Sequence, residues 1–253
     1  MIPIIRERLR QGMRTITYPK SPPTLPDRFL GLPVLDDSKC ETGCRGCAEA
    51  CPTNAIAKSD DVLTLDMGCC LFCNECALAC PEDGAIRFTQ EFRLAARKRE
   101  DLIVRSREER PLMQSLDQKM QSLFGRSLKL RQVSAGGDNA SEADLNVLGT
   151  VVFDMGRFGI QFVASPRHAD GIVVTGPVTE NMKFALLTAY EAVPAPKLVI
   201  AVGANAISGG IFKGCREVHD GVEGLLPVDL YIPGDPPHPL TILDGLLRLL
   251  GRI

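Results

Sequence analysis

Cysteine spacing constrains this chain more than any other feature of its sequence. Nine of its ten cysteines lie between Cys40 and Cys80, and the tenth is Cys215. The first residues lack the apolar core and the small-residue cleavage site of a secretory signal, so we expect a cytoplasmic chain. Thiols stay reduced in that compartment, which favours metal binding over disulfides. The clustering therefore predicts a local metal module followed by a domain of different chemistry.

The cysteines form two consecutive runs with the spacing of bacterial ferredoxins. The second run is Cys70-x2-Cys73-x2-Cys76-x3-Cys80, and Pro81 follows it. The first run is Cys40-x3-Cys44-x2-Cys47-x3-Cys51, with Pro52 after it and one residue more than usual between its first two cysteines. In such runs the first three cysteines bind one iron–sulfur cluster, and the fourth binds the other cluster.

The two runs predict two 4Fe–4S clusters with crossed ligands. Cluster one would bind Cys40, Cys44, Cys47 and Cys80. Cluster two would bind Cys51, Cys70, Cys73 and Cys76. Zinc is the competing interpretation, but zinc prefers four ligands from paired C-x2-C units, which two proline-terminated runs do not resemble. Cys69 and Cys215 remain, and we interpret both as buried thiols without a ligand role.

The first 36 residues predict a short helix followed by an extended arm. Residues 1–18 place apolar side chains at helical spacing between arginines, which indicates a basic amphipathic helix. This helix could pack on its own domain, or it could dock on a membrane surface or a membrane-bound subunit. Residues 19–36 contain five prolines and are expected to be extended.

Composition narrows the classes of function. The net charge of −2 argues against nucleic acid as a partner, because phosphate binding needs a basic excess. No apolar run reaches the roughly 18 residues that a membrane-spanning helix needs, so the sequence predicts no such helix.

The patterns divide the chain into four segments. They are 1–36 (helix and extended arm), 37–92 (two-cluster ferredoxin domain), 93–137 (charged linker) and 138–253 (α/β domain). Residues 93–135 are rich in arginine and are expected to be helical, with a solvated charged face.

The last segment has the pattern of a parallel sheet. Buried strands are expected at 171–176, 197–203 and 227–232, and helices at about 179–193 and 239–250. Apolar strands that alternate with helices predict a sheet covered on both faces. The expected fold class is an α+β ferredoxin-like two-cluster domain followed by an α/β flavodoxin-like domain with a parallel sheet.

Several motifs in the C-terminal half carry a family resemblance. They are Arg157-Phe-Gly-Ile160, Ala164-Ser-Pro-Arg-His-Ala-Asp170, Ser208-Gly-Gly-Ile-Phe212 and Pro227-Val-Asp-Leu-Tyr-Ile-Pro-Gly234. Through them residues 156–253 resemble the small subunit of membrane-bound nickel–iron hydrogenases of the formate-hydrogenlyase type, and the related complex I subunit that holds the last cluster. Residues 1–110, with the cysteine runs and Gly84-Ala-Ile-Arg-Phe-Thr-Gln-Glu-Phe92, resemble the two-cluster ferredoxin subunit of the same complexes. The chain thus looks like a fusion of two neighbouring subunits.

The C-terminal half departs from that family at four positions. Where the family has cysteines that bind a cluster, our alignment gives this chain Asp138, Ser141, Asn205 and Asp235. A cubane needs soft thiolates, so the comparison implies a vacated cluster site. Three interpretations stay open: polar side chains that fill the site, a hard cation such as magnesium or calcium, or a cluster bound through oxygen.

The resemblance implies an iron–sulfur electron-transfer subunit of a membrane-associated, complex I-like or nickel–iron hydrogenase-like oxidoreductase complex. The expected partners are a hydrogenase-like large subunit, membrane-arm subunits and a ferredoxin-like or other redox donor or acceptor, at the cytoplasmic face of the inner membrane. The alternative is a structural scaffold subunit in a related complex that has lost hydrogenase chemistry. No catalytic constellation is visible in the sequence, so we do not expect this chain to be an enzyme by itself.

Overall fold

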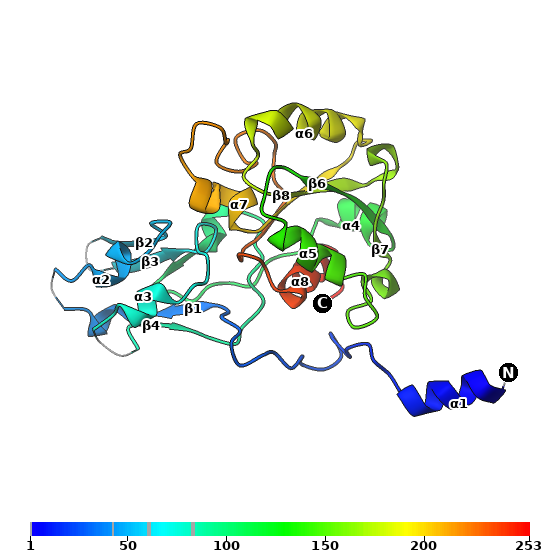
Figure 1. The fold of residues 1–253 in the computed structure, drawn as a ribbon, viewed down its shortest axis with the longest axis horizontal. Helices are drawn as coiled ribbons and strands as arrows, with labels where there is room; N and C mark the ends of the chain where they lie inside the picture. The colour runs from blue at the N-terminus through cyan, green and yellow to red at the C-terminus, as the bar shows by residue number, and fades with distance from the viewer. Residues whose placement is uncertain (1, 42, 60–61, 82–83) are drawn as a thin grey trace.

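A parallel β-sheet forms the centre of the C-terminal half in the computed structural model, which describes residues 2–41, 43–59, 62–81 and 84–253. Its five strands lie in the order β10-β9-β8-β6-β7, and β6, β7 and β8 are labelled in Figure 1. The strands are β6 (Leu128–Ser134), β7 (Ile160–Phe162), β8 (Gly171–Thr175), β9 (Leu198–Val202) and β10 (Leu230–Ile232). All neighbouring strands are parallel, so the predicted parallel sheet and its three predicted strands are confirmed.

Both faces of the sheet are buried, because consecutive residues of each central strand enter different hydrophobic cores. Ile172 and Val174 of β8 belong to one core, whereas Val173 belongs to the other. The first core includes α6 (Glu180–Ala192) and α7 (Ala204–Ser208), and the second includes α5 (Ala140–Val147) and α8 (Pro239–Leu249). This double coverage explains why the strands are continuous apolar runs in the sequence.

The cysteine runs lie in a smaller module beside the sheet (Figure 1). It contains an antiparallel pair, β1 (Pro33–Leu35) with β4 (Ile86–Phe88), and a three-stranded antiparallel sheet of β2 (Ile56–Ser59), β3 (Val62–Asp66) and β5 (Ile103–Arg105). Each run contains one short helix, α2 (Gly46–Glu49) or α3 (Glu75–Leu78). The short 3-10 helices are Asp37–Lys39, Arg99–Leu102, Met155–Phe158, Pro166–His168 and Gly210–Phe212.

The charged segment 93–135 is not the helix that its composition suggested, and that expectation is wrong. Within this segment α4 (Gln118–Phe124) is the only α-helix, while β5 and β6 join two different sheets. The arginines do not form a solvated face, because several of them make specific contacts. Arg99 pairs with Asp66, and Arg110 donates to the backbone carbonyl groups of residues 93–95.

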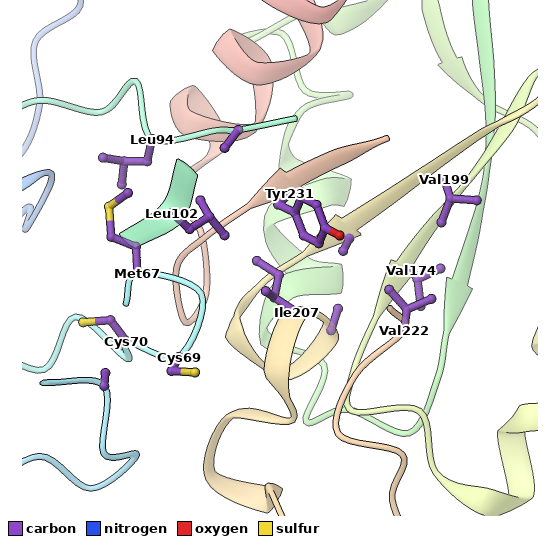
Figure 2. Close-up of a cluster of buried hydrophobic side chains, with 14 of the residues drawn as sticks. Met67, Cys69, Cys70, Leu94, Leu102, Val174, Val199, Ile207, Val222 and Tyr231 are labelled. Carbon is purple, nitrogen blue, oxygen red and sulfur yellow. The ribbon is translucent and has the colours of Figure 1, made fainter. Parts of the chain in front are cut away.

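The cysteine module and the sheet share one hydrophobic core. Figure 2 shows Met67 and Leu102 of the module on one side of this core, with Ile207 and Tyr231 of the α/β domain on the other. At the sheet edge, Ala96 and Tyr231 exchange two backbone hydrogen bonds, of 2.8 and 3.0 Å. This bridge covers the exposed side of β10 and fixes the module against it.

The N-terminal segment begins with α1 (Ile2–Gln11), which stands apart from the rest of the chain (Figure 1). The arm that follows is tied to the α/β domain. Arg157 donates to the carbonyl oxygen of Tyr18 at 2.7 Å, and the Tyr18 hydroxyl donates to the fully buried carboxylate of Asp244 at 2.5 Å. Arg248 donates to the same carboxylate at 2.9 Å. Among the described helices, none has the length and apolar character needed to span a bilayer.

The buried Tyr18–Asp244 hydrogen bond predicts a stability effect. Tyr18→Phe removes one of the two donors to Oδ1 of a buried carboxylate and leaves only the longer bond from Arg248, which should cost about 1–3 kcal/mol. We expect a lower midpoint in thermal unfolding followed by circular dichroism. Tyr190→Phe is the matched control, because Tyr190 contacts Lys197 through its ring, 4.1 Å from Nζ to the centroid. Equal midpoints for the two variants would contradict the anchoring role of Tyr18.

Candidate functional site

The first cavity of the cysteine module lies between the two runs and has a volume of about 550 Å³. Its lining includes four cysteines: Cys40, Cys44, Cys47 and Cys80. Cys47 lies on α2, and Cys80 follows the end of α3. The fold therefore brings the last cysteine of the second run to the first three cysteines of the first run, while their joint binding of a cluster stays a prediction.

A second, narrow cavity lies deeper in the module. Its lining includes four cysteines: Cys51, Cys70, Cys73 and Cys76. Cys70 and Cys76 are buried, whereas Cys73 is exposed. These are the four residues expected for cluster two, although the binding of a cluster to either set remains a prediction.

The chemistry of both cavities fits a 4Fe–4S cluster. Each offers four sulfur donors, the ligand type that such clusters need. The backbone N–H of Ala55 donates to Cys51 Sγ at 3.2 Å, and that of Phe72 donates to Cys70 Sγ at 3.3 Å. Such bonds stabilise negative charge on sulfur.

Burial raises the pKa of the Cys70 thiol to about 12 and that of Cys76 to about 11. Both groups therefore release their protons readily only when a cation takes the place of the proton. No three His, Cys, Asp or Glu side chains in the described part of the chain are arranged around a single ion. A cubane does not require that arrangement, because each of its cysteines binds a different iron.

The two spare cysteines lie in different environments. Cys69 is buried, as expected, and its thiol donates to Asp66 Oδ2 at 3.2 Å. The neighbouring Gly68 carbonyl accepts a hydrogen bond of 2.8 Å from Ser208 of α7, so this turn touches the α/β domain. The expectation of a buried Cys215 is wrong: this residue is exposed, because it lies in the loop that follows the 3-10 helix Gly210–Phe212.

The four positions of the predicted vacated site lie at the carboxyl edge of the sheet. Asp138 and Ser141 follow β6, Asn205 follows β9, and Asp235 follows β10. The loops touch at Gly203, which has φ +92°, and a Cβ atom there would lie 2.5 Å from Ser141 Oγ. Ser141 and Asn205 are buried, whereas Asp138 is exposed.

Electrostatics link the two acidic positions of this edge. Burial, and then the charge of Asp138, raise the pKa of Asp235 to about 6. Asn205 Oδ1 is buried and has no hydrogen-bond partner among the described residues. None of the four residues carries sulfur, so this edge does not fit a 4Fe–4S cluster. All four residues carry oxygen atoms, the ligand type that a hard cation prefers, so the hard-cation interpretation of this edge stays a prediction.

Sequence reasoning missed Glu142, a buried acid at this edge. Its Oε1 accepts hydrogen bonds from Ser134 at 2.5 Å and from Thr175 at 2.7 Å. The bond partners lie on two neighbouring strands, β6 and β8. An acid directly after Ser141, at the start of a helix, was the available signal.

Comparisons with known proteins give a consistent result. The family model for the NADH ubiquinone oxidoreductase 20 Kd subunit matches residues 139–249. The chain is 47% identical over 110 residues to an NADH-quinone oxidoreductase subunit of Citrifermentans bemidjiense, covering 44% of this chain and 64% of that protein. It is 42% identical over 128 residues to formate hydrogenlyase subunit 7 of Escherichia coli, covering 51% and 50% respectively. The chain thus spans half to two thirds of these two relatives.

A third relative is covered more fully. The chain is 37% identical over 130 residues to a probable membrane-bound hydrogenase subunit of Pyrococcus furiosus, covering 51% of this chain and 78% of that protein. Among solved structures, a chain of an archaeal membrane-bound sulfane sulfur reductase aligns with a TM-score of 0.47 and 30% identity, covering 54% of this chain and 75% of that one.

The raised pKa of Asp235 predicts a pH-dependent stability. Its folded value of about 6 lies above the ordinary value of 3.8, so the folded state holds this proton more tightly than the unfolded state. Stability contributed by the protonated form is therefore lost as pH rises from about 4 to about 6. At pH 7.5, Asp235→Asn should raise the free energy of unfolding by about 1 kcal/mol, a value that allows for the partial exposure of the side chain. The midpoint of thermal unfolding should rise accordingly.

The measurement compares thermal unfolding of wild type and Asp235→Asn between pH 5 and pH 7.5. The advantage of the variant should grow with pH. Asp27→Asn, at an exposed acid of the N-terminal arm, is the control and should show no such trend. A gain that is the same at both ends of the pH range would rule out the ionisation of Asp235 as its cause.

Proposed function

Since the chain belongs to the family of the NADH ubiquinone oxidoreductase 20 Kd subunit, we propose that it is an iron–sulfur electron-transfer subunit of a membrane-associated oxidoreductase complex. The relatives are named as subunits of NADH-quinone oxidoreductase, formate hydrogenlyase and membrane-bound hydrogenase. We infer from them that this chain works beside a hydrogenase-like large subunit and membrane-arm subunits, at the cytoplasmic face of the inner membrane. A ferredoxin-like or other redox protein exchanges electrons with it.

The observation that carries this proposal is the sorting of eight cysteines into two cavities of four. Each cavity draws three cysteines from one run and one from the other. A 4Fe–4S cluster, when bound, takes up and releases single electrons. The chain's own residues hold the sulfurs in place, donate backbone N–H groups to Cys51 and Cys70, and bury Cys70 and Cys76 away from water. These factors set the potential at which electrons are exchanged.

The proposed division of the chain follows from the same argument. Residues 37–92 form a two-cluster ferredoxin unit, preceded by the helix and arm of 1–36 and followed by the linker 93–137. Residues 138–253 form the unit related to the 20 Kd subunit, with a vacated cluster site at Asp138, Ser141, Asn205 and Asp235. The chain is in this view a fusion of two subunits that are separate in related complexes.

One observation favours a second candidate function. The carboxyl edge of the sheet carries oxygen and amide groups where a relative of this family would need thiols for a cluster. Without a cluster there, electrons lack a stepping stone through the α/β domain. The domain would then act as a scaffold for partner subunits, while the cysteine module alone exchanges electrons.

Iron content tests the proposal directly. Two clusters predict about eight iron atoms per chain after anaerobic purification, and a third cluster would give about twelve. Low-temperature EPR of the dithionite-reduced protein should show signals from two interacting clusters. A value near twelve would reject the vacated site, and a value near zero would reject the electron-transfer proposal.

Crossed wiring makes a sharper prediction for single variants. Cys80→Ala should remove the same EPR signal as Cys47→Ala, because both residues line the first cavity. Cys51→Ala should remove the same signal as Cys73→Ala, because both line the second. Exposed Cys215 lines neither cavity, so Cys215→Ala is the control and should keep its iron. If Cys80→Ala instead removes the same EPR signal as Cys73→Ala, each run binds its own cluster and the crossed wiring is wrong.

A further inference from the structure

An arginine–aspartate pair lies beside the turn that leads into Cys70. Arg99 begins the 3-10 helix Arg99–Leu102, and Asp66 is the last residue of β3. The guanidinium donates to Asp66 Oδ1 at 2.7 Å and to Asp66 Oδ2 at 2.5 Å. The side chains are only 21% and 25% exposed, respectively. The pair is therefore bidentate and mostly buried, unlike the weak ion pairs of an open protein surface.

Asp66 shapes the turn through its side chain and its backbone. Its carboxylate accepts hydrogen bonds from the backbone N–H of Gly68 at 2.8 Å and from the thiol of Cys69 at 3.2 Å. Its backbone carbonyl accepts from the N–H groups of Cys69 and Cys70, at 3.1 and 3.0 Å. Figure 2 shows Met67, Cys69 and Cys70 along this turn. The position of Cys70, a proposed ligand of cluster two, thus depends on Asp66.

Gly68 lets the guanidinium approach the backbone of this turn. A Cβ atom at position 68 would lie 2.7 Å from Arg99 Cζ and 2.8 Å from Arg99 Nη1, so only a residue without a side chain permits this approach. Nη2 of the same guanidinium lies 3.6 Å from Cys69 Sγ. The positive charge is therefore held next to the residue that precedes Cys70.

Contacts with two other segments keep the turn in place. The hydroxyl of Ser208, at the end of α7, donates to the carbonyl oxygen of Gly68 at 2.8 Å and is buried. The backbone N–H of Met67 donates to the carbonyl oxygen of Leu102 at 3.0 Å. The α/β domain and the 3-10 helix of Arg99 thus fix the turn, and both charges of the pair keep defined positions relative to Cys70.

The signs of the two charges decide how they act on a cluster. Reduction adds one negative charge to a 4Fe–4S cluster, so a nearby carboxylate disfavours the reduced form and a nearby guanidinium favours it. Asp66 and Arg99 both lie within 3.6 Å of Cys69 Sγ, so their opposite effects largely cancel. Loss of either partner leaves the other charge partly buried and uncompensated.

We propose that Arg99 and Asp66 are positioning residues that hold the turn of Cys70 and balance its local charge, and that they thereby set the reduction potential of cluster two. This inference rests on the proposed function, because it requires a cluster at Cys51, Cys70 and their two partners in the second cavity. Neither Arg99 nor Asp66 is itself a ligand.

The test is an EPR-monitored redox titration of the anaerobically purified full chain at pH 8, with the signals assigned by the spectrum of Cys73→Ala. Arg99→Gln leaves the carboxylate uncompensated and should lower the potential of cluster two. Asp66→Asn leaves the guanidinium uncompensated and should raise this potential. Each variant should change the equilibrium constant of the one-electron reduction at least threefold, which is about 28 mV at 59 mV per tenfold change.

A double variant separates charge balance from loss of structure. Arg99→Gln combined with Asp66→Asn removes both charges, so its potential should lie between those of the single variants and within a threefold change of wild type. A loosened turn would instead shift both single variants in the same direction. Shifts of equal sign, or no shift in either single variant, would overturn the proposal.

Gly68→Ala tests the approach of the guanidinium without removing a charge. The three atoms nearest to the added Cβ all belong to the end of the flexible Arg99 side chain, so the arginine can move while the backbone keeps its conformation. The potential of cluster two should fall, as in Arg99→Gln but by less. An unchanged or raised potential would overturn the assigned position of the charge. If Arg99→Gln fails to retain cluster two, Gly68→Ala and Asp66→Asn still give the two opposite signs.

Arg107→Gln is the matched control. Arg107 pairs with Asp37 at 2.9 Å, just before Cys40 of the first run, so its loss should leave the potential of cluster two unchanged. An equal fall in Arg107→Gln and Arg99→Gln would overturn the local effect of Arg99.

Iron is measured on the same samples, which separates this proposal from the proposed function. Wild type with about eight iron atoms per chain, but without the opposite shifts in the variants, overturns the role of Arg99 and Asp66 alone. Wild type without iron overturns the electron-transfer proposal and this inference together.

Discussion

The backbone bridge between Ala96 and Tyr231 is the contact on which the arrangement of the chain depends. It joins the segment that leaves the cysteine module to the edge strand of the parallel sheet, at the centre of a shared hydrophobic core. Edge strands are normally open to pairing with other chains, and here that edge is occupied from within. The cysteine cavities therefore have a fixed position relative to the carboxyl edge of the sheet. The region between the cavities and this edge has a fixed geometry as well.

Two kinds of chemistry meet in this region. On the side of the cysteine module, sulfur donors and backbone N–H groups favour a soft, redox-active cluster. On the side of the sheet, Asp235, Asn205 and Ser141 present oxygen and nitrogen atoms, and a neighbouring acid at position 138 adds negative charge. The relatives of this half of the chain are named as subunits of oxidoreductase complexes, and the residues at this edge are suited to hydrogen bonding.

Sequence patterns predicted the parts of this arrangement that depend on local spacing. The buried strands at 171–175 and 198–202 were visible because both of their faces are apolar. The strand β6 was missed because Lys129 and Arg131 interrupt its apolar residues, so it was included in the charged segment. The grouping of Cys80 with the first run followed from the spacing of the runs, and the fold places these residues around one cavity. The pairing of Arg99 with Asp66 had no signal in the sequence, because the two residues lie 33 positions apart in the chain.

The tether formed by Tyr18 and Asp244 links the beginning of the chain to its last helix. The segment before the cysteine module is thus held against the α/β domain at Tyr18, and the segment after it is held at Ala96. A cell that makes this chain produces the two modules in a one-to-one ratio and at a fixed mutual distance, without a separate assembly step. Any protein that contacts both modules therefore meets them already joined and in a fixed relative position.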